Sequence, residues 1–195
     1  MKRICLAVVV IALAGCQTQQ QGALPAPVAP PVSPQQPAPP TPAAVSAGPL
    51  TRAAVEIYMD AQEGDLRAYL RGQGRLVARR GDGLLVSIPN DRLFDKMELT
   101  TWGTAVITSV AQVLAHYDHS AVAVEAYTDS TGSDQENLTL SQKRAKIVSD
   151  ALARYGVAPA RLTASGLGAT NPMVTDPRDP RNRRIELKIT PTPSG

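Results

Sequence analysis

Residues 121–157 read AVAVEAYTDSTGSDQENLTLSQKRAKIVSDALARYGV, and this stretch decides the fold. Its first seven residues are mostly apolar on both faces, which is typical of a central strand covered by helices. A polar loop follows, and then Ala145, Val148 and Leu152 recur at helical spacing. Gly156 stands just past the last of them, where a helix end favours glycine. The stretch therefore predicts a strand, a loop and a helix in succession.

The flanking sequence extends this unit into one domain, because residues 50–195 have the length of a single ordinary domain. Apolar side chains recur at helical spacing in two more segments, and short apolar runs bounded by turn residues predict strands. The expected helices cover residues 51–70, capped by Thr51, and 101–116, and the expected strands cover residues 75–79, 84–88, 162–165 and 185–190. Alternating strands and helices predict an α/β fold, a two-layer βαβαβ sandwich with helices on one face of a small mixed sheet.

The N-terminus has the features of a processing signal. Lys2 and Arg3 precede an apolar run that is shorter than the roughly 20 residues needed to span a bilayer. The run ends in Leu-Ala-Gly-Cys at Cys16, which resembles the lipobox of bacterial lipoproteins. That resemblance implies a signal peptide over residues 1–15 and an acylated Cys16, with palmitate among its lipids. The alternatives are an ordinary secretory signal and a chance cysteine in an apolar segment.

The expected anchor places the protein at the periplasmic face of the outer membrane. Each buried methylene stabilises membrane association by about 0.8 kcal/mol, so the several acyl chains of a lipoprotein hold it permanently. Gln17 follows the cysteine where an aspartate would favour the inner membrane. Cys5 would be removed with the signal, which leaves the mature domain without a disulfide.

Residues 16–49 are expected to be a tether between the anchor and the domain. Ten of the 17 prolines lie between Pro25 and Pro49, and no charged residue lies between Gln17 and Thr51. Such a composition cannot bury enough apolar surface to fold, and at about 3.1 Å per residue it could span on the order of 100 Å. A PxxP ligand is the alternative. The expected order is thus signal 1–15, tether 16–49, helical segment 50–72 and globular domain 73–195.

The loop after the first strand carries groups suited to a zwitterion. Asp129 lies just past the strand end, where ligands of open α/β sheets gather. If the helix begins near Glu136, then Asn137, Leu140 and Arg144 share one stripe beside the buried face. A guanidinium suits a carboxylate and a carboxylate suits an ammonium, so the pair would fit an amino-acid head group. The alternatives are an Asx-turn at Asp129 and a surface ion pair of Arg144 with an acid such as Glu136.

Short motifs in this order resemble the OmpA-like peptidoglycan-associated domain, the Pal and OmpA C-terminal type. They are Thr-Asp at 128–129, N-x-x-L-S-x-x-R-A at 137–145, G-x-G-x-x-x-P at 166–172 and N-R-R-I-E at 182–186. Weaker similarity reaches back through GDGLLVSIPNDRLFD, so the resemblance covers roughly residues 75–190. Two places depart from the pattern. Ala126-Tyr127 replaces Gly-His or Gly-Tyr, and residues 175–181 replace a loop that often carries Gly-Arg.

The resemblance implies non-covalent binding of peptidoglycan through the diaminopimelate of its peptide stem. Asp129 would take the ligand's ammonium and Arg144 its carboxylate. Thr128 and Asn137 would add supporting hydrogen bonds. Arg183 would approach the same pocket from the last loop, and Leu140 would form one of its walls. The expected peptidoglycan-binding residues are Asp129, Arg144, Asn137, Thr128, Arg183 and Leu140.

Other function classes find little support in the residues. His116 and His119 lack an evident third metal ligand, no nucleophile motif is present, and we therefore expect no enzyme, metal or cofactor. The formal net charge of +3 does not indicate a nucleic-acid partner. A structural subunit of an envelope-spanning machine (Tol-Pal, secretion, pilus or stator type) stays open. In that case residues 51–72 could dock an envelope protein partner or simply pack on the same domain.

Overall fold

The computed structural model describes residues 52–71 and 76–192. The expected signal, the lipidated Cys16, the tether and the cap at Thr51 lie outside these ranges. Within them, no helix is both long enough and apolar enough to cross a membrane. The described residues form one compact unit.

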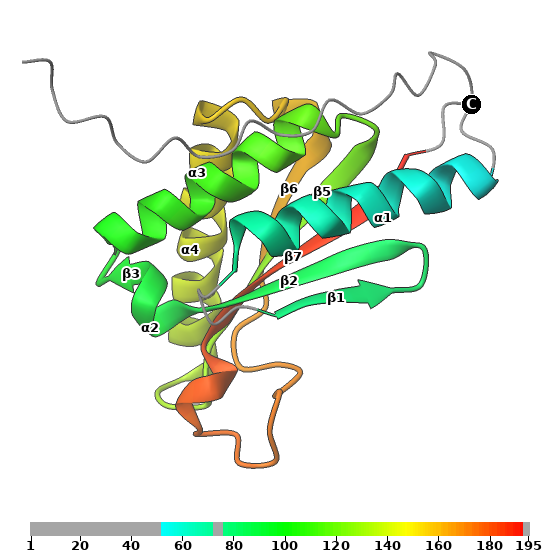
Figure 1. Cartoon of the computed structure of the whole chain (residues 1–195). Helices are drawn as coiled ribbons and strands as arrows, with labels where there is room; N and C mark the ends of the chain where they lie inside the picture. The colour runs from blue at the N-terminus through cyan, green and yellow to red at the C-terminus, as the bar shows by residue number, and fades with distance from the viewer. Residues whose placement is uncertain (1–51, 72–75, 193–195) are drawn as a thin grey trace, which may run out of the picture. The chain divides into compact units, whose positions relative to one another are not determined.

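A five-stranded mixed sheet forms one layer of the domain (Figure 1), as the sequence predicted. Its order is β1-β2-β7-β5-β6. Three of the four pairings are antiparallel, and only β5 and β6 run parallel. The strands are β1 (Leu76–Arg80), β2 (Gly83–Pro89), β5 (Ser120–Tyr127), β6 (Leu162–Gly166) and β7 (Arg184–Pro191).

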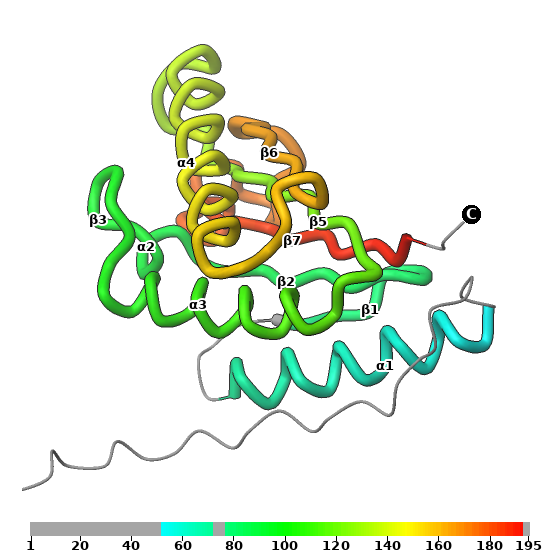
Figure 2. Tube along the Cα trace, turned by 90° about the horizontal axis from the view of Figure 1, so that it is seen from above, coloured from blue at the N-terminus to red at the C-terminus, as the bar shows by residue number. Residues whose placement is uncertain are grey.

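Three long helices form the second layer: α1 (Arg52–Tyr69), α3 (Thr101–His116) and α4 (Asp134–Arg154). Seen from above, α3 lies between α1 and α4 (Figure 2). The Thr100 side chain caps α3 by accepting a 2.8 Å hydrogen bond from the amide of Gly103. Ser133 and Glu136 form a capping box on α4, so this helix begins at Asp134, slightly before the expected start.

Strand register separates an apolar face of the sheet from a polar one. Val86, Leu187 and Val124 are cross-strand partners and are almost fully buried beneath the helices. The next residues along the same strands, Glu186 and Glu125, are partners on the opposite face. The helices therefore cover one face of the sheet, as predicted. The small side chains of Ala121 and Ala123 lie on the other, half-buried face.

Helix α1 packs on the domain with its apolar stripe. Met59 and Leu66 are fully buried, and the helix lies against α3 and β1. The Tyr58 hydroxyl accepts a hydrogen bond of 2.8 Å from the amide of His119, and the Tyr117 hydroxyl donates one of 2.8 Å to Asp65. These contacts tie α1 to the connection between α3 and β5, so α1 shares the core of the domain.

Several short elements escaped sequence analysis because they hold too few residues for a periodic pattern. Helix α2 (Asn90–Leu93) directly follows β2, where the sequence suggested only a polar bend. A small hairpin of β3 (Phe94–Asp95) and β4 (Glu98–Leu99) then leads into α3. Single 3-10 turns, η1 (Pro159–Arg161) and η2 (Pro180–Asn182), precede β6 and β7. Helix α2 matters for function because it borders the loop after β5.

Candidate functional site

The topology brings two distant segments together at one end of the sheet. Strands β5 and β7 are antiparallel, with Tyr127 opposite Arg184. The residues that follow β5 therefore meet the residues that precede β7. This places Asp129 beside Arg183, although they are far apart in the sequence. The sequence motif predicted that both contribute to one site, and the structure brings them together.

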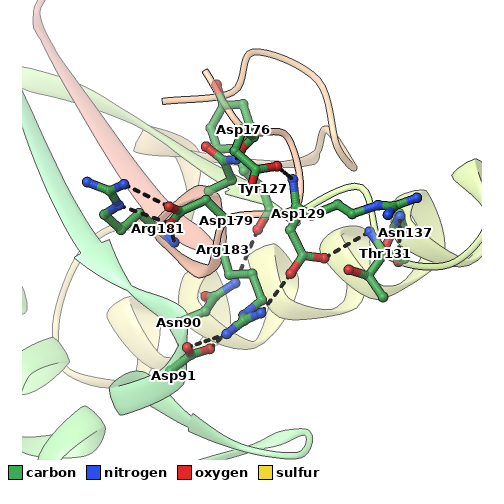
Figure 3. Close-up of polar contacts among 12 residues, drawn as sticks. Asn90, Asp91, Tyr127, Asp129, Thr131, Asn137, Asp176, Asp179, Arg181 and Arg183 are labelled. Carbon is green, nitrogen blue, oxygen red and sulfur yellow. Dashed lines mark hydrogen bonds and ion pairs between the residues drawn. The ribbon is translucent and has the colours of Figure 1, made fainter. Parts of the chain in front are cut away.

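Asp129 is nearly buried, with 6% of its surface exposed. One carboxylate oxygen, Oδ2, accepts a hydrogen bond of 2.7 Å from Nη1 of Arg183. The other, Oδ1, accepts one of 3.1 Å from the amide of Thr131 (Figure 3). The Asx-turn interpretation is thus correct for one oxygen, while the second oxygen is paired with a cation.

Arg183 is shared between two carboxylates. Its Nε and Nη2 donate hydrogen bonds of 2.9 and 2.6 Å to the two oxygens of Asp91, and its Nη1 reaches Asp129 (Figure 3). Hydrogen bonding to Asp91 raises the pKa of Arg183, and the same contact lowers the pKa of Asp91. Asp91, on α2, was missed by sequence analysis. Its only local signal was an acid just after a strand end at the same edge of the sheet.

Arg144 lies on α4, half-buried at the edge of the core stripe as its spacing predicted. Its guanidinium carbon is 5.6 Å from the ring centroid of Phe94, and its Nε is buried without a hydrogen-bond partner. Burial lowers the pKa of Arg144, while the charges of Asp91 and then Asp129 oppose that shift. Glu136, the acid named in the alternative interpretation, bonds to Ser133 in the capping box instead.

Thr128 and Asn137 hold the loop in place. The amide of Thr128 donates a hydrogen bond of 2.8 Å to the carbonyl of Gly168, and its hydroxyl oxygen is buried without a partner. Asn137 is 5% exposed, and its Nδ2 donates a hydrogen bond of 3.1 Å to the carbonyl of Thr131. Leu140 is half-buried on the next turn of α4, so its part as a pocket wall stays a prediction.

The departure at Ala126-Tyr127 has a structural explanation. Ala126 is fully buried in the core, whereas Tyr127 faces the other side of the sheet. The Tyr127 ring lies 3.8 Å from the guanidinium carbon of Arg184, and its hydroxyl donates a hydrogen bond of 2.6 Å to Glu125. Tyr127 therefore supports β7 from the far face, and its side chain points away from Asp129.

The proline-broken segment before β7 is joined to the loop after β5. The amide of Ser130 donates a hydrogen bond of 2.9 Å to the carbonyl of Pro177. Asn182 braces the same segment, accepting a bond of 2.7 Å from the amide of Met173 and donating one of 2.8 Å to the carbonyl of Asp176. Among the described residues, no group of three or more His, Cys, Asp or Glu side chains could hold a metal ion. The charged side chains gathered at the site are two carboxylates, Asp91 and Asp129, and two guanidinium groups, Arg144 and Arg183.

Known proteins are similar to this chain in sequence. The OmpA family model matches residues 93–186, which contain α3, β5, α4 and β6 and most of the site. The probable lipoprotein YiaD of Escherichia coli is 41% identical over 142 residues, which cover 70% of this chain and 65% of YiaD. The peptidoglycan-binding protein ArfA of Mycobacterium tuberculosis is 37% identical over 87 residues, covering 43% of this chain and 27% of ArfA.

A solved structure agrees in fold. It is described as the cell wall anchor of the T6SS from Pseudomonas aeruginosa, and it is 28% identical with a TM-score of 0.55. The match covers 65% of this chain and 96% of that one. The chain therefore spans slightly less than two thirds of YiaD and nearly all of the solved domain. The ordered motifs, the mixed sheet and these matches together show that residues 93–186 form an OmpA-like domain.

Proposed function

We propose that the domain binds peptidoglycan non-covalently, through the diaminopimelate residue of the peptide stem. The observation that carries this proposal is the state of Arg144. Its guanidinium is half-buried with an unpartnered Nε, in range of the charges of Asp129 and Asp91. A desolvated arginine without a hydrogen-bonded acceptor gains most from a ligand carboxylate, which offers two oxygens to the guanidinium fork.

The remaining groups complement the amino end of such a ligand. Asp129 receives the ammonium, with Arg183 yielding part of its contact to that carboxylate. The free hydroxyl of Thr128 and the side chain of Asn137 add hydrogen bonds, and Leu140 lies against the ligand's methylene groups. Relatives support this proposal, because ArfA is named a peptidoglycan-binding protein and the solved domain is described as a cell wall anchor.

The domain acts as one end of a link between the outer membrane and the cell wall. In this proposal residues 1–15 are the signal peptide, Cys16 carries the lipid, and residues 16–49 are the tether. The name of YiaD as a probable lipoprotein supports the anchor. Cells fed with labelled palmitate should label the full chain but not Cys16→Ser. Equal labelling of both would remove the anchor from the proposal.

The site holds, and does not cleave, its ligand.

A second role follows from the resemblance to a secretion-system anchor, in which wall binding serves a larger envelope assembly. Crosslinking in cells distinguishes the two roles. Protein partners that remain crosslinked when wall binding is abolished would favour the assembly, whereas partners lost together with wall binding would favour the simple link.

Co-sedimentation of the full chain, in detergent, with purified sacculi tests the binding site. Asp129→Asn and Arg144→Ala should each weaken binding by roughly thirtyfold, because removal of one partner of a buried charge pair costs about 2 kcal/mol or more. Asp118→Ala, at the opposite end of β5, and Arg154→Ala, exposed at the end of α4, are matched controls that should pellet like the wild type. If both site variants also pellet like the wild type, the proposed site is wrong.

A further inference from the structure

Asp91 is held beside the site by two hydrogen bonds that its neighbour Asn90 donates to backbone carbonyls. The amide of Asn90 donates a hydrogen bond of 2.9 Å to the carbonyl of Arg183, and its Nδ2 donates one of 3.2 Å to the carbonyl of Tyr127. Asn90 is therefore clamped to the ends of both β5 and β7, and it is 2% exposed. This clamp fixes the start of α2 so that the next side chain, Asp91, faces the guanidinium of Arg183.

Arg183 divides its hydrogen bonds unequally. Two of its nitrogens contact both oxygens of Asp91, at 2.9 and 2.6 Å, whereas only Nη1 contacts Asp129, at 2.7 Å. In this arrangement three nitrogens of Arg183 are used, two for Asp91 and one for Asp129. Asp91 thus holds the guanidinium in an orientation that makes one contact with one oxygen of Asp129.

We propose that Asp91 is the residue that makes this site selective for a ligand carrying both an ammonium and a carboxylate. This inference rests on the proposed function and names a positioning residue for it. When a ligand ammonium reaches Asp129, Arg183 gives up a single hydrogen bond and keeps two. Asp91 therefore lowers the free-energy cost of making Asp129 available.

Without Asp91, the same arginine becomes a competitor. Arg183 would have only Asp129 as a carboxylate partner and would turn its fork toward it, in the bidentate geometry that guanidinium groups favour. A ligand ammonium would then have to displace two charge-assisted hydrogen bonds and leave a partly buried guanidinium unpaired. Binding of the ammonium end would weaken, while a ligand without an ammonium would not meet this competition.

The charge balance of the site leads to the same conclusion. Asp91 and Asp129 together offset Arg144 and Arg183, so the site is neutral and accepts a neutral zwitterion without gaining net charge. Of the two carboxylates, Asp91 does more than Asp129 to raise the pKa of Arg144 against the effect of burial. Loss of Asp91 leaves two guanidinium groups and one carboxylate. That site would favour an anionic ligand over a zwitterionic one.

The experiment compares two small probes that share one carbon chain, meso-diaminopimelic acid and pimelic acid, which lacks both amino groups. The full chain in detergent is titrated with each probe by calorimetry, and the ratio of the two affinities is the readout. In Asp91→Asn the ratio should fall by about tenfold in favour of pimelic acid, as expected for loss of one charge-assisted hydrogen bond on the ammonium side. Asp91→Glu should restore most of the ratio.

Two comparisons separate positioning from a merely structural effect. Asp95→Asn removes an exposed carboxylate from the adjacent β3 and should leave the ratio unchanged. In the Arg183→Gln background, Asp91→Asn should change the ratio by about threefold or less, because the two residues act as a coupled pair. Since the Asp91 side chain is 54% exposed, its replacement should leave the thermal midpoint of the chain nearly unchanged.

The outcomes distinguish this inference from the proposed function beneath it. If the wild-type chain binds sacculi and prefers diaminopimelic acid but Asp91→Asn keeps the same ratio, only the role of Asp91 is overturned. An equal loss of affinity for both probes in Asp91→Asn would also overturn it. So would a change of the affinity ratio in the Arg183→Gln background that is as large as in the wild-type background. If the wild-type chain binds neither probe nor sacculi, the proposed function fails and this inference fails with it.

Discussion

Gly166 sits where β6 meets α4, and its replacement by alanine should test the position of that helix. A Cβ added at Gly166 would lie 2.1 Å from the backbone nitrogen of Gln142 and 2.6 Å from the carbonyl carbon of Ser141. Both obstacles are backbone atoms of α4, so no side-chain rotation relieves the clash. Gly166→Ala should therefore push α4 away from the edge of the sheet.

The magnitude follows from the overpacking and from two hydrogen bonds at the same contact. Overpacking of a well-packed core costs about 1–3 kcal/mol, with backbone obstacles at the upper end. The amide of Gly166 donates to Oε1 of Gln142 at 2.8 Å, and the amide of Gly168 donates to Oγ of Ser141 at 2.9 Å. Each is worth about 1 kcal/mol. We expect a loss of about 4 kcal/mol in the free energy of unfolding, which lowers the thermal midpoint by more than about 10 °C.

Circular dichroism with urea and thermal unfolding measures this loss, and Gly64→Ala provides a control of opposite sign. Gly64 lies inside α1, and a Cβ there would meet nothing within 4 Å. The control should gain about 0.5–1 kcal/mol, because alanine loses less backbone entropy in a helix than glycine does. A loss below about 1 kcal/mol in Gly166→Ala would refute the close approach of α4 to β6. Since α4 carries Arg144, the variant should also bind sacculi more weakly at temperatures where it is folded.

Two further predictions concern the stability of the scaffold. Arg161 donates four hydrogen bonds, to the carbonyls of Leu114, Tyr117 and Ser120 and to the Ser120 hydroxyl, so Arg161→Ala should cost about 3 kcal/mol in urea unfolding. Arg161→Lys should lose less of the free energy of unfolding than Arg161→Ala does, but more than the wild type. A loss under about 1 kcal/mol in Arg161→Ala would contradict the stabilising role of these four hydrogen bonds. Hydrogen bonds from Arg181 lower the pKa of Asp179 to about 2, so its stabilising effect is complete above an unfolded pKa near 4 and disappears as the pH falls through about 2. The stability difference between wild type and Asp179→Asn should therefore shrink between pH 5 and pH 2, and a constant difference would speak against the ion pair.

The sequence alone determined the elements that are long enough to show a period. The spacing of apolar residues in 101–116 and the capped helix around Ala145 predicted α3 and α4, because burial of one helix face imposes a repeat of about 3.6 residues. Ordered motifs then carried the family resemblance, and with it the expected roles of Asp129 and Arg144. Local chemistry sufficed for these predictions, since caps, turns and hydrophobic stripes act between near neighbours in the chain.

Tertiary structure decided the features that depend on which strand lies beside which. The contact between Asp129 and Arg183 exists because β5 and β7 are antiparallel neighbours in the sheet, an arrangement that no local pattern encodes. Asp91 enters the site because its neighbour Asn90, just after β2, hydrogen-bonds to the last residue of β5 and to the residue before β7. The opening loop showed an acid and a base and suggested a ligand between them. The fold adds a second carboxylate, Asp91, and joins it to Arg183, which the ordered motifs had already predicted for the site. Residues far apart in sequence interact strongly only once packing has removed the water between them.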